Sequence, residues 1–143
     1  MQIRDVMTKP AIRIHPKETV AVAARMLEHY NIGILPVCGQ DGKVRGMVTD
    51  RDLVIRCLAS GKAPGATPVE DVMTKQVVSV PPETEVQEAL CYMAQRQIRR
   101  LPVVEKGKLC GMVSLGDMAV KEETVREAAS ALGKISGNLS VRD

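Results

Sequence analysis

The sequence predicts a mixed α/β (α+β) fold built from two tandem copies of one small unit. Three observations lead to this fold class: a repeat that runs through most of the chain, the same order of elements in both copies, and an aliphatic composition. A register kept over such a length indicates two copies of one structural unit. The matching segments are Asp-Val-Met-Thr-Lys at 5–9 and 71–75, Leu-Pro-Val at 35–37 and 101–103, and Gly-Met-Val at 46–48 and 111–113.

Each copy is expected to hold a strand, a helix, two further strands and a second helix. The first helix carries apolar residues at i, i+3, i+4 and i+7, which is typical of a helix buried on one face. The second helix should begin at Thr49 or Ser114, and Thr84 with Gln87 should form a capping box in copy two. The expected strands are 11–14, 34–37 and 44–48, then 77–80, 100–104 and 109–113, and the apolar helix positions are Val20, Ala23, Ala24, Leu27 and Val86, Ala89, Leu90, Met93.

The repeat also sets the expected domain bounds. Neither copy is large enough to close a core alone, so we expect the two to pack on one another as one module. Gly and Pro concentrate between the copies, which indicates a linker. The expected bounds are repeat 1 at 1–59, the linker at 60–69, repeat 2 at 70–121, and a last segment at 122–143 that holds a C-terminal helix (about 122–132) followed by a mobile tail.

The composition predicts an aliphatic core. Hydrophobic residues make up 45% of the chain but aromatic residues only 1%, with Tyr30 and Tyr92 as the two aromatics. The core must therefore be built from Val, Ile, Leu, Ala and the eight Met residues, and we assign the two tyrosines to packing. A planar ligand would have to be held between aliphatic side chains.

Charge and hydropathy argue against two classes of partner. A formal net charge of +3 is ordinary for a soluble protein and too weak to indicate nucleic-acid binding. No apolar run approaches the roughly 20 residues that a membrane helix needs. Arg4 and Asp5 stand where a signal peptide would be apolar. We therefore expect a cytoplasmic protein with no membrane partner.

The four cysteines, Cys38, Cys57, Cys91 and Cys110, do not recur between the copies and form no Cys-x-x-Cys pair. We expect reduced, partly buried thiols. A metal site with His15 or His29 and a disulfide are the alternatives. No combination of His, Ser, Cys or carboxylates indicates catalysis, so we expect neither an enzyme nor a catalytic cofactor.

At this point the chain resembles the CBS domain family. Asp-Val-Met-Thr, a helix, an apolar-Pro-Val strand and a Gly-apolar-apolar-Thr/Ser-x-x-Asp segment occur in that order, twice, over residues 3 to about 120. Two such domains in tandem look like a Bateman module, and this chain is similar to small stand-alone bacterial CBS-pair proteins. The resemblance implies two repeats packed with pseudo-two-fold symmetry, and a homodimer.

Thr49-x-x-Asp52 and Ser114-x-x-Asp117 have two compatible interpretations. Read alone, each is a capping signal at the start of a helix. The family resemblance implies that the Asp holds the hydroxyls of a ribose and that the Thr or Ser lies near phosphate. Free backbone N–H groups at the helix start would also suit phosphate.

The resemblance further implies two clefts, each sharing residues of both repeats. Two arginines of copy two correspond to Gly33 and Ile34 in copy one, so we expect the first cleft to bind nucleotide more tightly. Arg96, Arg99 and Arg100 can also be read as a solvated basic face. The first cleft would hold Met47, Thr49, Arg51, Asp52, Val77, Val78, Arg99 and Arg100, and the second Met112, Ser114, Asp117, Ala11, Ile12, Gly33 and Ile34. Met47 and Met112 can equally belong to the core.

The predicted function is a regulatory sensor that binds an adenosine-containing ligand such as AMP, ADP, ATP or S-adenosylmethionine. Ligand that bridges the repeats would shift their arrangement and so inform an unknown downstream protein partner. The alternative is a structural or protein-binding CBS pair with no nucleotide ligand. Nucleic-acid binding is the weaker rival, because the chain lacks aromatic platforms for bases.

Overall fold

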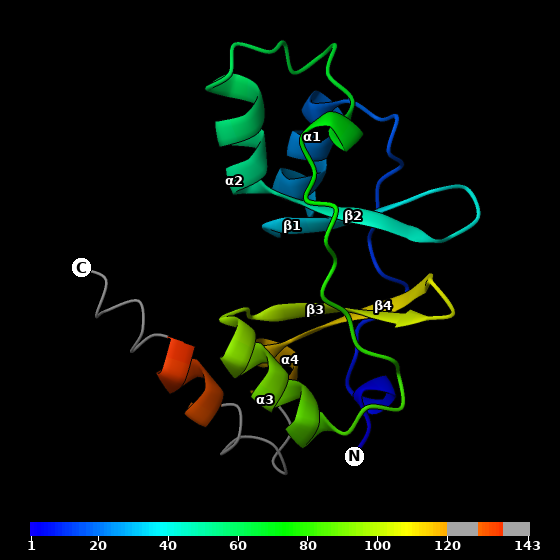
Figure 1. Cartoon of the computed structure of the whole chain (residues 1–143), viewed down its shortest axis with the longest axis vertical. Helices are drawn as coiled ribbons and strands as arrows, with labels where there is room; N and C mark the ends of the chain where they lie inside the picture. The colour runs from blue at the N-terminus through cyan, green and yellow to red at the C-terminus, as the bar shows by residue number, and fades with distance from the viewer. Residues whose placement is uncertain (120–128, 136–143) are drawn as a thin grey trace. The chain divides into compact units, whose positions relative to one another are not determined.

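A computed structural model describes residues 1–119 and 129–135 of the chain (Figure 1). The chain divides into two compact units. Unit 1 holds Met1–Ala11, Val78–Lys106 and the chain from Cys110, and unit 2 holds Ile12–Val77 with Gly107–Leu109.

Unit 2 is a β-hairpin with two helices on the same side of it (Figure 1). Its elements are α1 (Val20–Tyr30), β1 (Ile34–Cys38), β2 (Val44–Thr49), α2 (Asp50–Asp52), η2 (Leu53–Leu58) and η3 (Val69–Asp71). β1 and β2 are antiparallel, and the register pairs Ile34 with Thr49. The helix α1 begins after Thr19, whose hydroxyl accepts from the amide of Val22, and ends at Asn31 in a left-handed conformation.

Unit 1 repeats this plan. Its elements are η1 (Ile3–Asp5), α3 (Val86–Arg96), β3 (Arg100–Glu105), β4 (Lys108–Ser114) and α4 (Leu115–Ala119). The first two residues of β4 belong to unit 2, and the strand belongs to unit 1 from Cys110 onward. Residues 129–135 are also helical, and they bring Ala131 and Ile135 into the core of this unit. The predicted C-terminal helix therefore lies partly, and the predicted tail largely, outside the described residues.

Each unit has its own aliphatic core, as the composition predicts. The apolar stripes of α1 and α3 face inward, except that Ala24 is exposed. Tyr92 packs against the core of unit 1. Tyr30 was expected to pack but is 45% exposed at the end of α1, where its ring meets His29 edge-on.

The Asp-Val-Met-Thr motif of each repeat pairs with the second strand of the other repeat. In unit 1 the amide of Thr8 donates to the carbonyl of Met112 (2.8 Å), and the reverse bond is 3.1 Å. In unit 2 Met47 and Thr74 exchange the same two bonds, at 2.9 and 2.8 Å. The compact units therefore do not coincide with the sequence repeats. Unit 1 contains the first motif of repeat 1 and most of the rest of repeat 2, whereas unit 2 contains the first motif of repeat 2 and most of the rest of repeat 1.

The expected first strands at 11–14 and 77–80 shrink to single parallel bridges, Ile14 with Val37 and Val80 with Val103. Prolines explain the short pairing. In a parallel ladder the next donors after Ile14 and Val80 would be Pro16 and Pro82, and the donors before them would be Pro36 and Pro102. None of these prolines has an N–H group, so the ladder stops on both sides of one bridge.

One other prediction meets a different outcome. The capping box of Thr84 with Gln87 is wrong, because α3 begins after Glu85 with no side-chain cap. Thr84 is instead buried, and its carbonyl accepts from the amide of Ile3. The stretch expected as a linker, 60–69, is bonded to the start of α1. The amide of Val20 donates to the carbonyl of Thr67, and Ala21 donates to Pro64.

Candidate functional site

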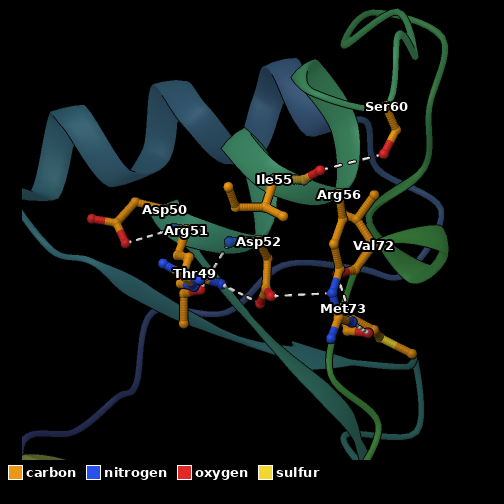
Figure 2. A network of polar contacts seen from close by, with 9 residues as sticks. All are labelled: Thr49, Asp50, Arg51, Asp52, Ile55, Arg56, Ser60, Val72 and Met73. Carbon is orange, nitrogen blue, oxygen red and sulfur yellow. Dashed lines mark hydrogen bonds and ion pairs between the residues drawn. The ribbon is translucent and has the colours of Figure 1, made fainter. Parts of the chain in front are cut away.

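Thr49 and Asp52 form a reciprocal capping box at the junction of β2 and α2 (Figure 2). The hydroxyl of Thr49 accepts from the amide of Asp52 at 3.1 Å, and Asp52 Oδ2 accepts from the amide of Thr49 at 3.0 Å. The capping interpretation of this motif is therefore confirmed. The box leaves one carboxylate oxygen, Oδ1, outside the cap.

The first amides of α2 already have partners. Asp50 donates to the carbonyl of Gly33 at 3.1 Å, Arg51 donates to Asp50 Oδ1 at 2.8 Å, and Asp52 donates to Thr49. The expectation of free N–H groups for phosphate is therefore wrong at this helix start. A phosphate here would have to be bound by side chains, such as the exposed Arg51 or the hydroxyl of Thr49, which can still donate its proton.

Arg56 faces the remaining oxygen of Asp52. Its Nε lies 3.7 Å from Asp52 Oδ1, and the side chain of Asp52 is 12% exposed whereas that of Arg56 is 52% exposed. The same guanidinium donates through Nη1 to the carbonyl of Met73 at 3.1 Å and to that of Val72 at 3.4 Å. Figure 2 shows Arg56 between Asp52 on one side and the Val72–Met73 segment on the other.

The helix widens directly after Asp52. Residues Leu53–Leu58 form a π-helical segment, in which the amide of Ala59 donates to the carbonyl of Val54 and the hydroxyl of Ser60 to that of Ile55. Such segments are rare and occur often at functional sites. Arg56 lies in this segment, four positions after Asp52.

Ser114 and Asp117 form the equivalent box in unit 1. Asp117 Oδ2 accepts from the amide of Ser114 at 2.9 Å, and the hydroxyl of Ser114 accepts from the amide of Asp117 at 3.0 Å. The repeat thus conserves the box in both units, although the capping residue is Thr in one and Ser in the other.

The structure places the two predicted arginines beside the Ser114 box. The carbonyl of Arg99 accepts from the amide of Leu115 at 3.0 Å, as that of Gly33 accepts from Asp50. Both Arg99 and Arg100 are exposed and belong to unit 1, whereas Thr49 and Asp52 belong to unit 2. Their expected grouping with Asp52 stays a prediction. Arg96 lies over the ring of Tyr92, 5.3 Å from its centroid.

The other predicted site residues divide between the two units. Unit 2 holds Met47 (buried) and Ile12, Gly33, Ile34 and Val77 (all half-buried), and unit 1 holds Ala11 (buried) and Val78 and Met112 (half-buried). Ile34 pairs with Thr49 across the hairpin, so its side chain stands beside the box. Met47, at 8% exposure, fits the core interpretation, whereas Met112 remains partly accessible.

Arg56 was not among the site residues predicted from the sequence. Its spacing of four from Asp52 is the usual signal of a helical ion pair, but its backbone partners lie 16 and 17 positions away. Arg56 also lines an open hollow of about 730 Å³ in unit 2, together with Lys62, Glu70, Asp71, Met73, Thr74, Lys75 and Gln76.

The four cysteines are thiols outside any disulfide. Cys38 and Cys57 are buried and Cys110 is half-buried, but Cys91 is exposed, against the expectation that all four would be partly buried. Burial raises the pKa of the Cys38 thiol, and the nearby Asp41 charge adds to this while Arg13 opposes it.

Within residues 1–119 and 129–135, no three His, Cys, Asp or Glu side chains gather as metal ligands would. In the same part of the chain, no helix has the length and apolar character needed to cross a membrane.

A family model for the CBS domain matches residues 3–58 and 69–122, once in each copy of the repeat. The chain belongs to the CBS domain family. Each match contains one capping box, so the boxes sit at equivalent places in the two CBS domains of a CBS pair. CBS pairs of this kind are regulatory modules.

This CBS pair is 42% identical over 134 residues to the CBS domain-containing protein YhcV of Bacillus subtilis, with 94% of each chain covered. Two solved structures are also similar. Hypoxic Response Protein I with two coordinated zinc ions is 34% identical, with a TM-score of 0.76 over 84% of this chain and 98% of that chain. The CBS domain pair of protein MJ0100, in complex with 5′-methylthioadenosine and S-adenosyl-L-methionine, is 27% identical, with a TM-score of 0.73 over 84% of this chain and 94% of that chain.

Proposed function

We propose that this CBS pair is a sensor for an adenosine-containing ligand, and that Asp52 and Asp117 accept hydrogen bonds from its ribose. The observation that carries the proposal is the divided use of the Asp52 carboxylate. One oxygen closes the capping box, while the other faces only the ion pair with Arg56 among the contacts of the described residues. A fixed carboxylate with an available oxygen is suited to hold a hydroxyl group.

The surroundings of Asp52 support a nucleoside over a more polar ligand. Ile34 stands opposite Thr49 in the hairpin and is half-buried. Aliphatic side chains of this kind can cover the faces of a purine, and the chain has no Trp or Phe to stack on it. The MJ0100 CBS pair was solved with two molecules that both carry an adenosine, which supports the same ligand class here.

Phosphate recognition would fall to side chains, because the first amides of α2 are occupied. Arg51 is exposed next to the box, and Arg99 and Arg100 are the further candidates that the sequence suggests. We retain the prediction that the cleft served by Asp52 binds nucleotide more tightly than the one served by Asp117.

The test is calorimetry with adenosine, AMP, ADP, ATP and S-adenosylmethionine on wild type, Asp52→Asn and Asp117→Asn. Asparagine keeps an acceptor for the cap but loses the charge, so loss of binding would not reflect unfolding. Glu28→Gln is the control, since it removes an exposed carboxylate from α1. We expect one ligand to bind and Asp52→Asn to weaken it at least about tenfold, as for a lost charged hydrogen bond.

Two other results would redirect the proposal. Binding that depends on Asp117 and not on Asp52 would reverse the ranking of the two sites. No binding by wild type to any of the five ligands would favour the alternative, a structural or partner-binding CBS pair in which both boxes act only as helix caps.

We also propose that the module acts as a homodimer. Val54, Ile55 and Leu58 lie close together on η2, and 51%, 49% and 57% of their surfaces are exposed. Grouped apolar side chains of this kind are typical of an interaction surface. A second copy of the chain would cover them and would link the helix that carries Asp52 to its counterpart.

A further inference from the structure

We propose that Arg56 is a positioning residue that couples the Asp52 carboxylate to the backbone of Val72 and Met73, so that ligand held by Asp52 changes how this segment is anchored. The ligand step rests on the proposed function. The coupling itself is a property of the free protein.

The carbonyls that Arg56 contacts come at the end of a short helical turn. η3 covers Val69–Asp71, and the amides of Val72 and Met73 both turn back to the carbonyl of Val69, at 3.0 and 2.9 Å. The carbonyls that follow such a turn have no partner within it. Arg56 supplies that partner from another helix, which explains why a guanidinium is placed here.

The segment beyond Met73 returns to the strand that carries Thr49. Thr74 exchanges two backbone bonds with Met47, and Met47 precedes Thr49 by two positions on β2. The contacts therefore form a closed ring that runs from Thr49 through Asp52, Arg56 and the Met73–Thr74 backbone to β2 and back. A change at one member of a closed ring must be accommodated by the others.

A ligand would contact this ring of interactions at Asp52 Oδ1. That oxygen is 3.7 Å from Arg56 Nε, which is longer than a hydrogen bond. A ribose hydroxyl that donates to Oδ1 would compete with the guanidinium of Arg56 for the same negatively charged oxygen. The guanidinium would then be held less by Asp52, and its bonds to the Val72 and Met73 carbonyls would change.

The coupling can be tested without ligand by hydrogen exchange at the Thr74 amide, which donates to Met47 at 2.8 Å. The variants are Arg56→Gln, Asp52→Asn and the double substitution, with Arg25→Gln as a control that removes an exposed arginine from α1. We expect Arg56→Gln to speed exchange about two- to tenfold, a modest factor because the side chain is half exposed. Asp52→Asn should also speed exchange, but should add nothing in the Arg56→Gln background.

The ligand step uses AMP and S-adenosylmethionine as probes on wild type and Arg56→Gln. We expect a bound probe to change Thr74 exchange at least about twofold in wild type. In Arg56→Gln the probe should still bind by calorimetry but leave Thr74 exchange unchanged.

The outcomes separate this inference from the proposed function. Additive effects of Asp52→Asn and Arg56→Gln, or no difference between Arg56→Gln and Arg25→Gln, would refute the coupling whether or not ligand binds. A probe that binds wild type without altering Thr74 exchange would refute the ligand step and leave the proposed function standing. If neither probe binds wild type, the ligand step fails, whereas the proposed function fails only if adenosine, ADP and ATP do not bind either. The ligand-free variants still decide the coupling.

Discussion

The α-carbon of Gly46 approaches the carbonyl of Thr74 so closely that a β-carbon on Gly46 would lie 2.7 Å from that oxygen. The same β-carbon would lie 2.7 Å from the sulfur of Met73. Gly111 has the same relationship to Thr8 in unit 1, also at 2.7 Å. Because it has no side chain, the glycine of each Gly-Met-Val motif allows the Met-Thr backbone of the other repeat to pair closely with β2 or β4.

Gly46→Ala should destabilise unit 2, because Thr74 is held by two backbone bonds and cannot move away cheaply. We expect a loss of about 1–3 kcal/mol in the free energy of unfolding, as for other overpacked sites. Urea denaturation measures it. Gly65→Ala is the matched control, since nothing lies within 4 Å of its β-carbon position. Equal midpoints for the two variants would show that the close approach is not a constraint.

Thr49→Val should lower stability through the capping box. Valine has the shape of threonine but cannot accept from the amide of Asp52, so about 0.5–2 kcal/mol should be lost. Thr49→Ser keeps the hydroxyl, as Ser114 does in unit 1, and should restore most of the midpoint in a thermal or urea titration. A serine variant as unstable as the valine variant would point to packing of the threonine methyl group instead of the cap.

The cysteines should differ in reactivity. Cys91 is exposed, whereas Cys38 is buried and has a raised pKa, chiefly because burial disfavours the thiolate. Iodoacetamide at neutral pH, followed by peptide mass spectrometry, should label Cys91 many-fold faster than Cys38. Rapid labelling of both in the folded protein would contradict the burial of β1.

The same pKa shift has a consequence for stability. A thiol whose pKa is raised by folding contributes stability that is complete below the pKa of the unfolded thiol, about 8.5. This contribution is lost as pH rises above that value, because the unfolded chain then releases the proton more readily. Cys38→Ala should weaken the decline of stability between about pH 8 and 10 relative to wild type, as measured by urea denaturation.

Leu58→Asp should break the proposed homodimer. A charge placed in the apolar surface of Val54, Ile55 and Leu58 would have to be buried without a partner. Light scattering after gel filtration should give a dimer mass for wild type and a monomer mass for the variant, with unchanged circular dichroism. A monomeric wild type at high concentration would contradict the proposal, and so would a variant that stays dimeric.

Much of the local structure could be predicted from the sequence. The hairpin strands, the buried faces of α1 and α3, and the helix starts at Thr49 and Ser114 are all confirmed within a residue or so. These features depend on residues close together in the chain. An apolar stripe and a Thr-x-x-Asp cap can each be recognised from a short stretch of sequence, without knowledge of the tertiary structure.

The first strands were predicted wrongly for a non-local reason. Residues 11–14 and 77–80 have strand-like composition, but the donors that would extend their pairing are prolines, two of which lie on the partner strands. The capping box at Thr84 failed similarly. A contact with Ile3, far away in the sequence, uses the carbonyl of Thr84, and α3 begins one residue later than the local pattern indicates.

By itself, the sequence determined the tandem repeat, the order of elements in each copy and the two Asp residues at equivalent helix starts. Only the tertiary structure decided that each Asp-Val-Met-Thr motif pairs with the strand of the other repeat, and that Arg56 joins Asp52 to the carbonyls of Val72 and Met73. The physical reason is that repeats and caps arise from short-range patterns in the chain. Which of two equivalent strands a motif joins, and which carbonyls a guanidinium reaches, depends on how distant segments meet in space.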